Sequence, residues 1–186
     1  MKVLIIGGGG REHAIAYSLS KSSYVDEIHA IPGNPGISKI GFCHNGNVED
    51  IESILKFVEE NNIDYTIVGP EVPLCLGLSD LLEDNGHSVF GPRKEASKLE
   101  GSKVYSKEFM IRHNIPTAKY QSFDNFYDAK EALKDFEYPV VIKADGLAAG
   151  KGVVICENEN IAVDTLNELM NEKPMSGQHA TEHPVV

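Results

Sequence analysis

The chain has 186 residues, enough for one large domain or two small ones with buried cores. Its 17 Lys and Arg residues and 28 Asp and Glu residues give a formal net charge of −11. This acidic balance argues against nonspecific nucleic-acid binding, although a loop or a helix N-terminus can still hold an anionic ligand.

The cysteines are Cys43, Cys75 and Cys156, which are far apart and form no CxxC pair. We therefore expect reduced thiols rather than disulfides. Met1 leads directly into an apolar strand, without the charged region and long apolar segment of a signal peptide. The apolar runs are too short to span a bilayer, so we expect a cytoplasmic protein with no membrane partner.

Apolar segments and helix signals alternate through the N-terminal half. Val3–Ile6 is an apolar run typical of a buried parallel strand, and the glycines of Gly7–Gly10 lead from it into a helix, as at the opening of a Rossmann-like unit. Asn47 is expected to cap an amphipathic helix. Further strands are expected over 28–31, 63–68 and 88–90, and another helix over 74–82. This order predicts an α/β fold whose parallel sheet has helices on both faces.

The C-terminal half has a different order: helix, strand, helix, strand, strand and helix. Ser102 is expected to cap the first of these helices and Asp124 the second. Residues 171–186 are polar and contain prolines, so we expect an irregular tail there. The expected elements are a helix over 103–113, a strand over 120–123, a helix after residue 124, a two-stranded hairpin within 138–156 and a helix over about 160–170.

The hairpin contains a glycine-rich loop with two lysines. Lys143 precedes the loop, Lys151 lies within it, and the glycines are Gly146, Gly150 and Gly152. Glycines let backbone N–H groups turn toward an anion and lysines supply the countercharge, so we interpret the loop as a nucleoside-triphosphate loop rather than an ordinary hairpin turn. The spacing excludes a Walker A motif, which also opens a helix. A phosphate cover between two antiparallel strands fits better.

The Gly7–Gly10 turn matches only the start of a dinucleotide-binding GxGxxG motif. Glu12 occupies the third glycine position, and the second strand ends at 31–34 without the acidic residue that holds a ribose. Both departures argue against a nicotinamide cofactor. The turn still suits a phosphate, and Arg11 adds hydrogen-bond donors, with a merely tight turn as the alternative.

Strand ends rich in glycine and proline, at 32–36, 69–71 and 91–92, fall on the carboxyl edge of the predicted sheet. Ligands bind at this edge in doubly wound sheets, so we favour a pocket over unrelated turns. We expect His13 to have a structural or substrate-contacting role rather than to act as a base. The remaining histidines show no metal-ligand spacing. Lys103, considered without other information, is interpreted as a solvent-exposed lysine on a helix.

Six motifs stand out in order along the chain: GGGGREHAIA at 7–16, PGNPG at 32–36, IDYTIVGPEVPL at 63–74, FGPRKEASKLEGSK at 90–103, RHNIPTA at 112–118 and VIKADGLAAGKGV at 141–153. Together they resemble the glycinamide ribonucleotide synthetase family, ATP-grasp ligases of purine biosynthesis. Each motif alone is moderately specific, whereas six in the family's order, covering about residues 1–156, are strongly so.

The resemblance implies a Rossmann-like domain at 1–105 on the phosphoribosylamine side. Residues 106–186 would start an ATP-grasp domain, with its small α+β B subdomain at about 120–170. It also reverses the interpretation of Lys103, because the family's GSK lysine and strand lysine hold nucleotide phosphates. The implied phosphoribosylamine contacts are Gly9, Gly10, Arg11, Glu12, His13, Gly33, Asn34, Pro35, Gly69, Pro70 and Glu71. The implied ATP contacts are Lys103, Lys143, Asp145, Gly146, Ala149, Gly150, Lys151 and Gly152.

The chemistry that the resemblance implies uses ATP, glycine and phosphoribosylamine, with Mg2+ or Mn2+. ATP phosphorylates the glycine carboxylate, and the amine of phosphoribosylamine then displaces phosphate to give glycinamide ribonucleotide, with ADP as the other product. Family members are more than twice as long as this chain, and their metal-holding Glu and Asn lie beyond the matched residues. We therefore expect no metal ligands in this chain and no ligation by the chain alone.

Three alternatives stand beside this reading. The first is a fragment that binds a phosphoribosyl or nucleotide ligand without chemistry, and titration with ribose 5-phosphate and ATP would distinguish it. The second is another ATP-grasp ligase of nucleotide metabolism, which the pairing of GGREHA with PGNPG disfavours. The third is a nicotinamide oxidoreductase, which the missing acid after the second strand disfavours.

Overall fold

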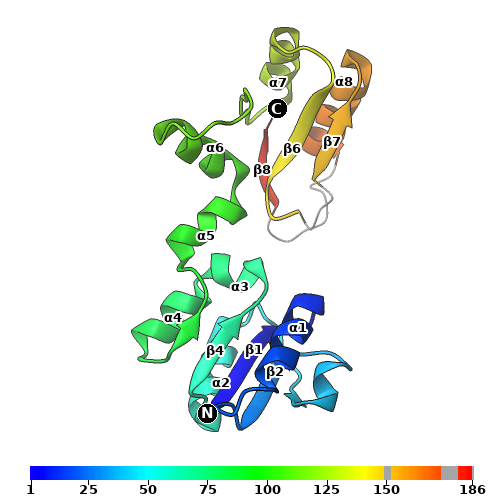
Figure 1. Cartoon of the computed structure of the whole chain (residues 1–186). Coiled ribbons are helices and arrows are strands. Elements are labelled where there is room, and N and C mark those ends of the chain that lie inside the picture. The colour runs from blue at the N-terminus through cyan, green and yellow to red at the C-terminus, as the bar shows by residue number, and fades with distance from the viewer. Residues whose placement is uncertain (149–151, 173–179, 186) are drawn as a thin grey trace. The chain divides into compact units, whose positions relative to one another are not determined.

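The computed structural model describes residues 1–148, 152–172 and 180–185. The chain divides into two compact units, unit 1 (Met1–Ser97) and unit 2 (Lys98–Val186), whose elements are labelled in Figure 1. Within the described ranges, no helix has both the length and the apolar character needed to cross a membrane.

Unit 1 is built on a five-stranded sheet whose neighbouring strands are all parallel. The strand order is β3-β2-β1-β4-β5. The chain moves outward from β1 to β3 and then crosses back to β4, so the topological switch point lies between β1 and β4. The predicted parallel α/β sheet is confirmed, and β3, a two-residue strand with exposed side chains, was not expected. The strands are β1 (Lys2–Gly7), β2 (Glu27–Pro32), β3 (Phe42–Cys43), β4 (Tyr65–Val68) and β5 (Val89–Phe90).

The helices of unit 1 differ from the sequence expectation at two points. The helix expected over 74–82 is two helices, because Gly77 takes a φ of +101° and breaks the first. Asp50, and not Asn47, caps the helix α2 over 51–61. The Asp50 Oδ1 accepts from Ser53 N at 3.1 Å. Both residues are good caps, so composition alone did not separate them. The helices are α1 (Gly10–Leu19), η1 (Ile37–Lys39), α2 (Ile51–Asn61), α3 (Glu71–Leu76) and α4 (Leu78–Asp84), and α5 (Lys94–Gly101) runs from unit 1 into unit 2.

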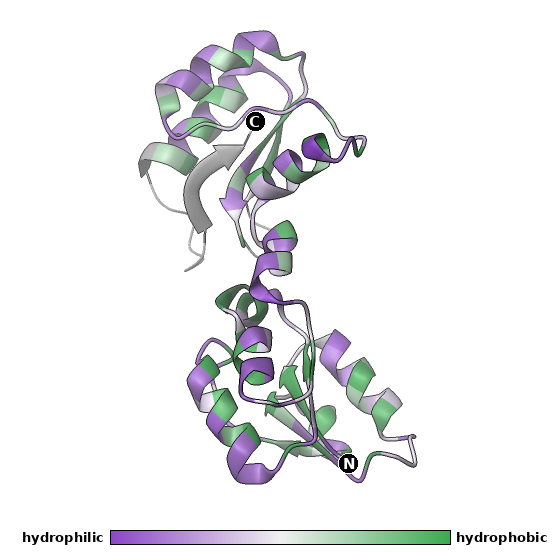
Figure 2. Cartoon of the chain, turned by 90° about the vertical axis from the view of Figure 1, so that its left-hand side faces the viewer, coloured by the Kyte–Doolittle hydropathy of each residue, from purple (hydrophilic) through white to green (hydrophobic). Residues whose placement is uncertain are grey.

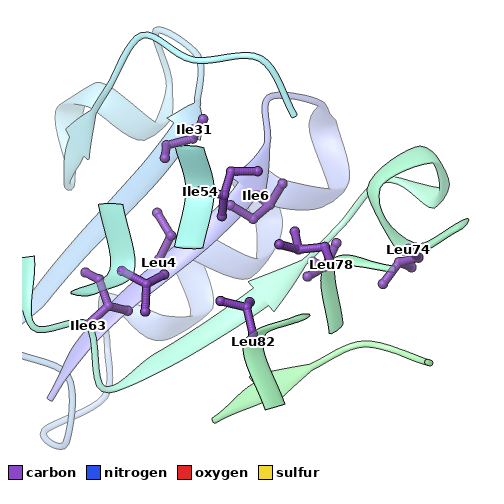
Figure 3. Packing of buried hydrophobic residues seen from close by; sticks show 10 residues of the cluster. Leu4, Ile6, Ile31, Ile54, Ile63, Leu74, Leu78 and Leu82 are labelled. Atoms are coloured by element: carbon purple, nitrogen blue, oxygen red, sulfur yellow. The ribbon is translucent and has the colours of Figure 1, made fainter. Parts of the chain in front are cut away.

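The central strand β1 is buried between two apolar layers. Leu4 and Ile6 pack with Ile54 of α2 in one cluster (Figure 3), while Ile5 joins Ala16 of α1 in another. The alternation follows because successive side chains of a strand point to opposite faces. In Figure 2 the strands of this sheet are coloured mainly as hydrophobic, and the helices around them carry both colours. Packing on both faces fixes the end of β1, and with it the turn that follows.

Unit 2 contains a three-stranded antiparallel sheet of order β7-β6-β8. Its core combines buried side chains of β6, such as Val140 and Ile142, with Leu133 and with Leu166 of α8. The predicted antiparallel hairpin is confirmed as β6 and β7. The elements are α6 (Lys103–Arg112), α7 (Phe126–Ala132), η2 (Leu133–Asp135), β6 (Val140–Gly146), β7 (Val153–Cys156), α8 (Glu159–Asn167), the π-helix η3 (Glu168–Glu172) and β8 (Ala180–Val185).

Three expectations for unit 2 were wrong. No strand forms over 120–123, where only an isolated bridge occurs at Ser122, and Asn125 rather than Asp124 caps α7. The region expected to be an irregular tail, 171–186, contains the end of η3 and the strand β8. β8 is ordered by backbone pairing with the edge of β6. Such pairing does not require alternating apolar residues, so the sequence pattern did not predict this strand.

Candidate functional site

The turn between β1 and α1 is the centre of the first candidate site. Gly9 caps α1, and the helix begins at Gly10, so N–H groups of the first turn lack intrahelical acceptors. Glu12 turns back over this helix start: its Oε2 accepts from Gly9 N at 2.5 Å, and its side chain is 4% exposed. The other oxygen, Oε1, is buried with no hydrogen-bond donor in the part of the chain that the structure describes.

Asn34 joins this turn to the loop that follows β2. Its Nδ2 donates to the carbonyl oxygens of Gly8 at 3.0 Å and Gly9 at 3.3 Å. Its Oδ1 accepts from the backbone N–H groups of Gly36 at 2.8 Å and Ile37 at 2.9 Å. One amide side chain therefore satisfies both loops and holds them together, which explains the PGNPG spacing physically.

The loop after β2 is also packed closely against the glycine turn. Gly33 N donates to Gly7 O at 3.2 Å, and a side chain on Gly8 would overlap the Gly33 carbonyl. The His13 ring lies over Gly36, where a methyl group would collide with it. Pro35 contributes its carbonyl oxygen, which accepts from Ser38 Oγ at 3.0 Å. His13 is thus a packing residue of the loop in this structure.

The end of β4 completes the first site. Gly69 N donates to Ile6 O at 3.0 Å, and Pro70 lies at the cap position of α3. Arg11 Nη2 lies 3.4 Å from Glu71 Oε2 in an exposed ion pair. The turns after β1, β2 and β4 are therefore brought together around the switch point between β1 and β4, whereas Gly91, in the third predicted strand end, lies against Leu74 and Ser79.

The second candidate site lies in unit 2 and begins with Asp145, at the end of β6. This buried carboxylate accepts from Lys103 N at 2.5 Å, Val104 N at 3.2 Å and Ser102 Oγ at 3.0 Å. Ser102 Oγ itself accepts from Tyr105 N at 3.1 Å. The predicted ligand residue Asp145 is therefore used to fix the N-terminus of α6 against β6.

This arrangement places lysines on one face of unit 2. Lys103 Nζ donates to Gly146 O at 2.7 Å. Burial is the largest cause lowering the pKa of Lys103; the Asp145 carboxylate opposes this shift, and Lys143 reinforces it. Lys143 also contributes, after burial, to lowering the pKa of Lys107. A group of neighbouring cations forms a site suited to an anion.

A cavity of about 250 Å³ adjoins these lysines. Lys107 and Lys143 line it together with the Tyr120 ring, which lies 5.6 Å from Lys107 Nζ. Lys107 Nζ also donates to Thr117 Oγ1 at 2.7 Å. Sequence reasoning missed Lys107 and Tyr120. The signal for Lys107 was its place four residues after Lys103 on one helix face.

The sheet beside the cavity has an exposed apolar face. Val141 pairs with Ile155, and Lys143 with Val153, across β6 and β7. The exposed fractions of Val141, Val153 and Ile155 are 38%, 47% and 61%, which is high for β-branched side chains in a sheet. An apolar face next to lysines can accommodate a ligand with a flat apolar part and an anionic part.

The glycine-rich loop is described only at its two ends. Gly146 has a φ of +89°, and Ala144 N donates to Gly152 O at 2.8 Å, which closes the base of the loop. The predicted residues Ala149, Gly150 and Lys151 lie outside the described residues. Among the described residues there is no group of three or more His, Cys, Asp or Glu side chains that could hold a metal ion.

Comparison with protein families gives two matches that together cover the chain. The model described as phosphoribosylglycinamide synthetase, N domain, matches residues 1–100. The model described as phosphoribosylglycinamide synthetase, ATP-grasp (A) domain, matches residues 101–186.

Similar curated proteins carry the name phosphoribosylamine–glycine ligase. The one from Clostridium acetobutylicum is 47% identical over 177 residues, covering 95% of this chain and 42% of its own length. The one from Fusobacterium nucleatum is 50% identical over 173 residues, covering 93% and 41%. The chain thus spans less than half the length of the curated relatives it matches.

Solved structures agree with these matches. The crystal structure of phosphoribosylamine–glycine ligase from Thermotoga maritima has a TM-score of 0.81 and 35% identity, covering 100% of this chain and 43% of that one. The biotin carboxylase domain of 2-oxoglutarate carboxylase from Hydrogenobacter thermophilus has a TM-score of 0.75 at 22% identity, covering 99% of this chain and 43% of that one, a likeness of fold alone.

Proposed function

Because this chain belongs to the phosphoribosylglycinamide synthetase family, we propose that it takes part in the ATP-dependent joining of glycine to 5-phosphoribosylamine. The product is glycinamide ribonucleotide, an intermediate of purine biosynthesis, with ADP and phosphate released. The observation that carries the proposal is the meeting of the turns after β1, β2 and β4 around the switch point of unit 1, beside a helix N-terminus.

We propose that residues 1–105 form the phosphoribosylamine side, with the phosphate near the start of α1. The N–H groups of Gly10 and Arg11 and the Arg11 guanidinium are donors suited to a phosphate. Asn34 and Glu12 also fix the turns on either side. The proposed contact set on this side is Gly9, Gly10, Arg11, Glu12, His13, Gly33, Asn34, Pro35, Gly69, Pro70 and Glu71.

We propose that unit 2 holds ATP on the face that carries Lys103 and Lys143, with the base toward the 250 Å³ cavity. The exposed apolar face of β6 and β7 suits a purine ring, and the lysines suit phosphates. Lys107 and Tyr120 join the proposed site because they line the same cavity. Gly146–Gly152 is the proposed phosphate cover, and residues 106–186 are the proposed start of the ATP-grasp domain, with its B subdomain at about 120–170.

The expected reaction forms a bond between a glycine carboxylate oxygen and the γ-phosphorus of ATP as the bond to ADP breaks. The amine of phosphoribosylamine then forms the amide bond as phosphate leaves. In these steps Lys103 and Lys143 would offset charge on the phosphates. The described residues do not fit a metal site, so no role for Mg2+ or Mn2+ is derived from them. A cytoplasmic location follows from the proposed pathway.

Calorimetric titration of the 186-residue chain with ribose 5-phosphate and with ATP tests the proposal. We expect both to bind, and Lys143→Ala to weaken ATP about ten- to hundredfold, as when a hydrogen bond to a charged group is lost. Lys130→Ala, which removes an exposed lysine of α7, should leave ATP affinity unchanged. Binding of neither ligand by the unaltered chain would refute the proposed function.

A further inference from the structure

The Glu12 side chain contacts two of the strand-end turns at once. It is the third residue of α1, yet its carboxylate reaches back over the turn after β1, where Oε2 accepts from Gly9 N at 2.5 Å. A side chain on Gly69, in the turn after β4, would overlap its Oε1, Cδ and Cγ atoms. The carboxylate therefore lies between the ends of β1 and β4, at the switch point of the sheet.

This carboxylate explains why Gly9 and Gly69 are glycines. Gly9 has a φ of −85°, and Gly69 is outside the left-handed region, so neither backbone requires glycine. A methyl group on Gly9 would lie 2.7 Å from Glu12 Oε2, and the three atoms nearest to a methyl group on Gly69 all belong to Glu12. Gly10 is different, because a methyl group there would meet no described atom within 4 Å.

A helix cap alone does not account for Glu12. A cap needs one acceptor oxygen, and Oε2 supplies it. Oε1 is buried without a donor in the described part of the chain, an arrangement that is rare in folded proteins and disfavours folding. Groups held in an unfavourable environment persist only where the surrounding structure fixes them, and they cluster at functional sites.

We infer that Glu12 is a positioning residue that locks the turn after β1 to the turn after β4. By accepting from Gly9 N–H and filling the space beside Gly69, it leaves the N–H groups of Gly10 and Arg11 as the donors for an anion. The effect on ligand binding rests on the proposed function, whereas the contact between Glu12 and the two glycines does not.

A double-mutant cycle on stability tests the contact. Gly69→Ala should lower the urea midpoint of the 186-residue chain, and the same change in a Glu12→Ala background should lower it no further, because the new methyl group fills the vacated space. Gly9→Ala gives a second cycle should Gly69→Ala not fold, and Gly10→Ala, in open space, is the stability control. Additive effects in both cycles would overturn the inference.

Titration with ribose 5-phosphate tests the positioning role. Glu12→Ala, checked for folding by circular dichroism, should bind about ten- to hundredfold more weakly, and Glu12→Gln, which keeps an acceptor oxygen and the shape, should recover most of the affinity. Equal loss in both variants, or none in Glu12→Ala, would overturn the role. Failure of the unaltered chain to bind ribose 5-phosphate would refute the phosphoribosylamine side of the proposed function and the ligand half of this inference, while the stability cycles would still decide the contact.

Discussion

Both units hold a buried carboxylate at a helix N-terminus, but the two carboxylates reach their helices by different routes. Glu12 bonds to Gly9 N, three residues earlier on its own helix start. Asp145 comes from the end of β6 and bonds to Ser102, Lys103 and Val104, which are 41 to 43 residues earlier in the chain. The Glu12 cap of unit 1 is therefore a local contact, whereas the lysine face of unit 2 exists only once α6 has docked on β6.

The largest expected effect comes from removing the long-range carboxylate. Asp145→Ala leaves two backbone N–H groups and Ser102 Oγ without their acceptor, so the free energy of unfolding should fall by about 2–3 kcal/mol. Urea denaturation followed by circular dichroism measures this. Glu157→Ala, which removes an exposed carboxylate of the same unit, should cost less than about 0.5 kcal/mol. An Asp145→Ala variant as stable as the unaltered chain would remove the proposed difference between the units.

A smaller effect is expected from the amide that holds unit 1's turns. Asn34→Ala removes hydrogen bonds to Gly8 O, Gly36 N and Ile37 N, and we expect a loss of about 1–2 kcal/mol, because neighbouring backbone bonds remain. Asn47→Ala is the matched control, since its Oδ1 accepts only from Glu49 N in an exposed turn of the described structure. A loss larger than that of Asp145→Ala would reverse the expected ranking of these two side chains.

The smallest effect is a pH response in unit 1. His44 Nε2 lies 3.0 Å from His29 Nδ1, and burial, followed by the charge of His29, lowers the pKa of His44. Its contribution to stability is complete above the unfolded pKa of about 6.5 and is lost as the pH falls toward the folded pKa. The free energy of unfolding should thus decrease between pH 7 and pH 5, and His44→Asn should flatten the decrease. Identical slopes in both proteins would contradict this.

Features that depend on neighbouring residues could be predicted from the sequence, whereas features that depend on contacts between distant residues could not. The parallel sheet, the glycine turn at 7–10 and the hairpin were predicted because apolar runs and glycines mark them within a few residues. The gathering of the strand ends at 32–36 and 69–71 beside this turn followed from topology alone, which wrongly added the strand end at 91–92. The role of Asp145 could not be predicted, because it depends on α6 and β6 meeting across forty residues of chain.

Other misses have the same origin. Strand β3 and strand β8 are set by backbone pairing with β2 and β6, not by a side-chain pattern of their own. Tyr120 entered the candidate site through the shape of a cavity, which no spacing records. The break at Gly77 was the exception, because a glycine inside a helical pattern was visible but was not taken as a stop.

The helix α6 has one further consequence. None of its residues is buried in the described structure, and its firm attachment is at the N-terminus, through Ser102 and Asp145. A helix whose side chains are at most half-buried gains less from tertiary packing than one with a fully buried face, so its last turn can unfold locally while the sheet of unit 2 stays intact. Amide hydrogens from about Phe109 onward would then exchange with solvent faster than those at the capped end, giving the helix a gradient of protection along its length.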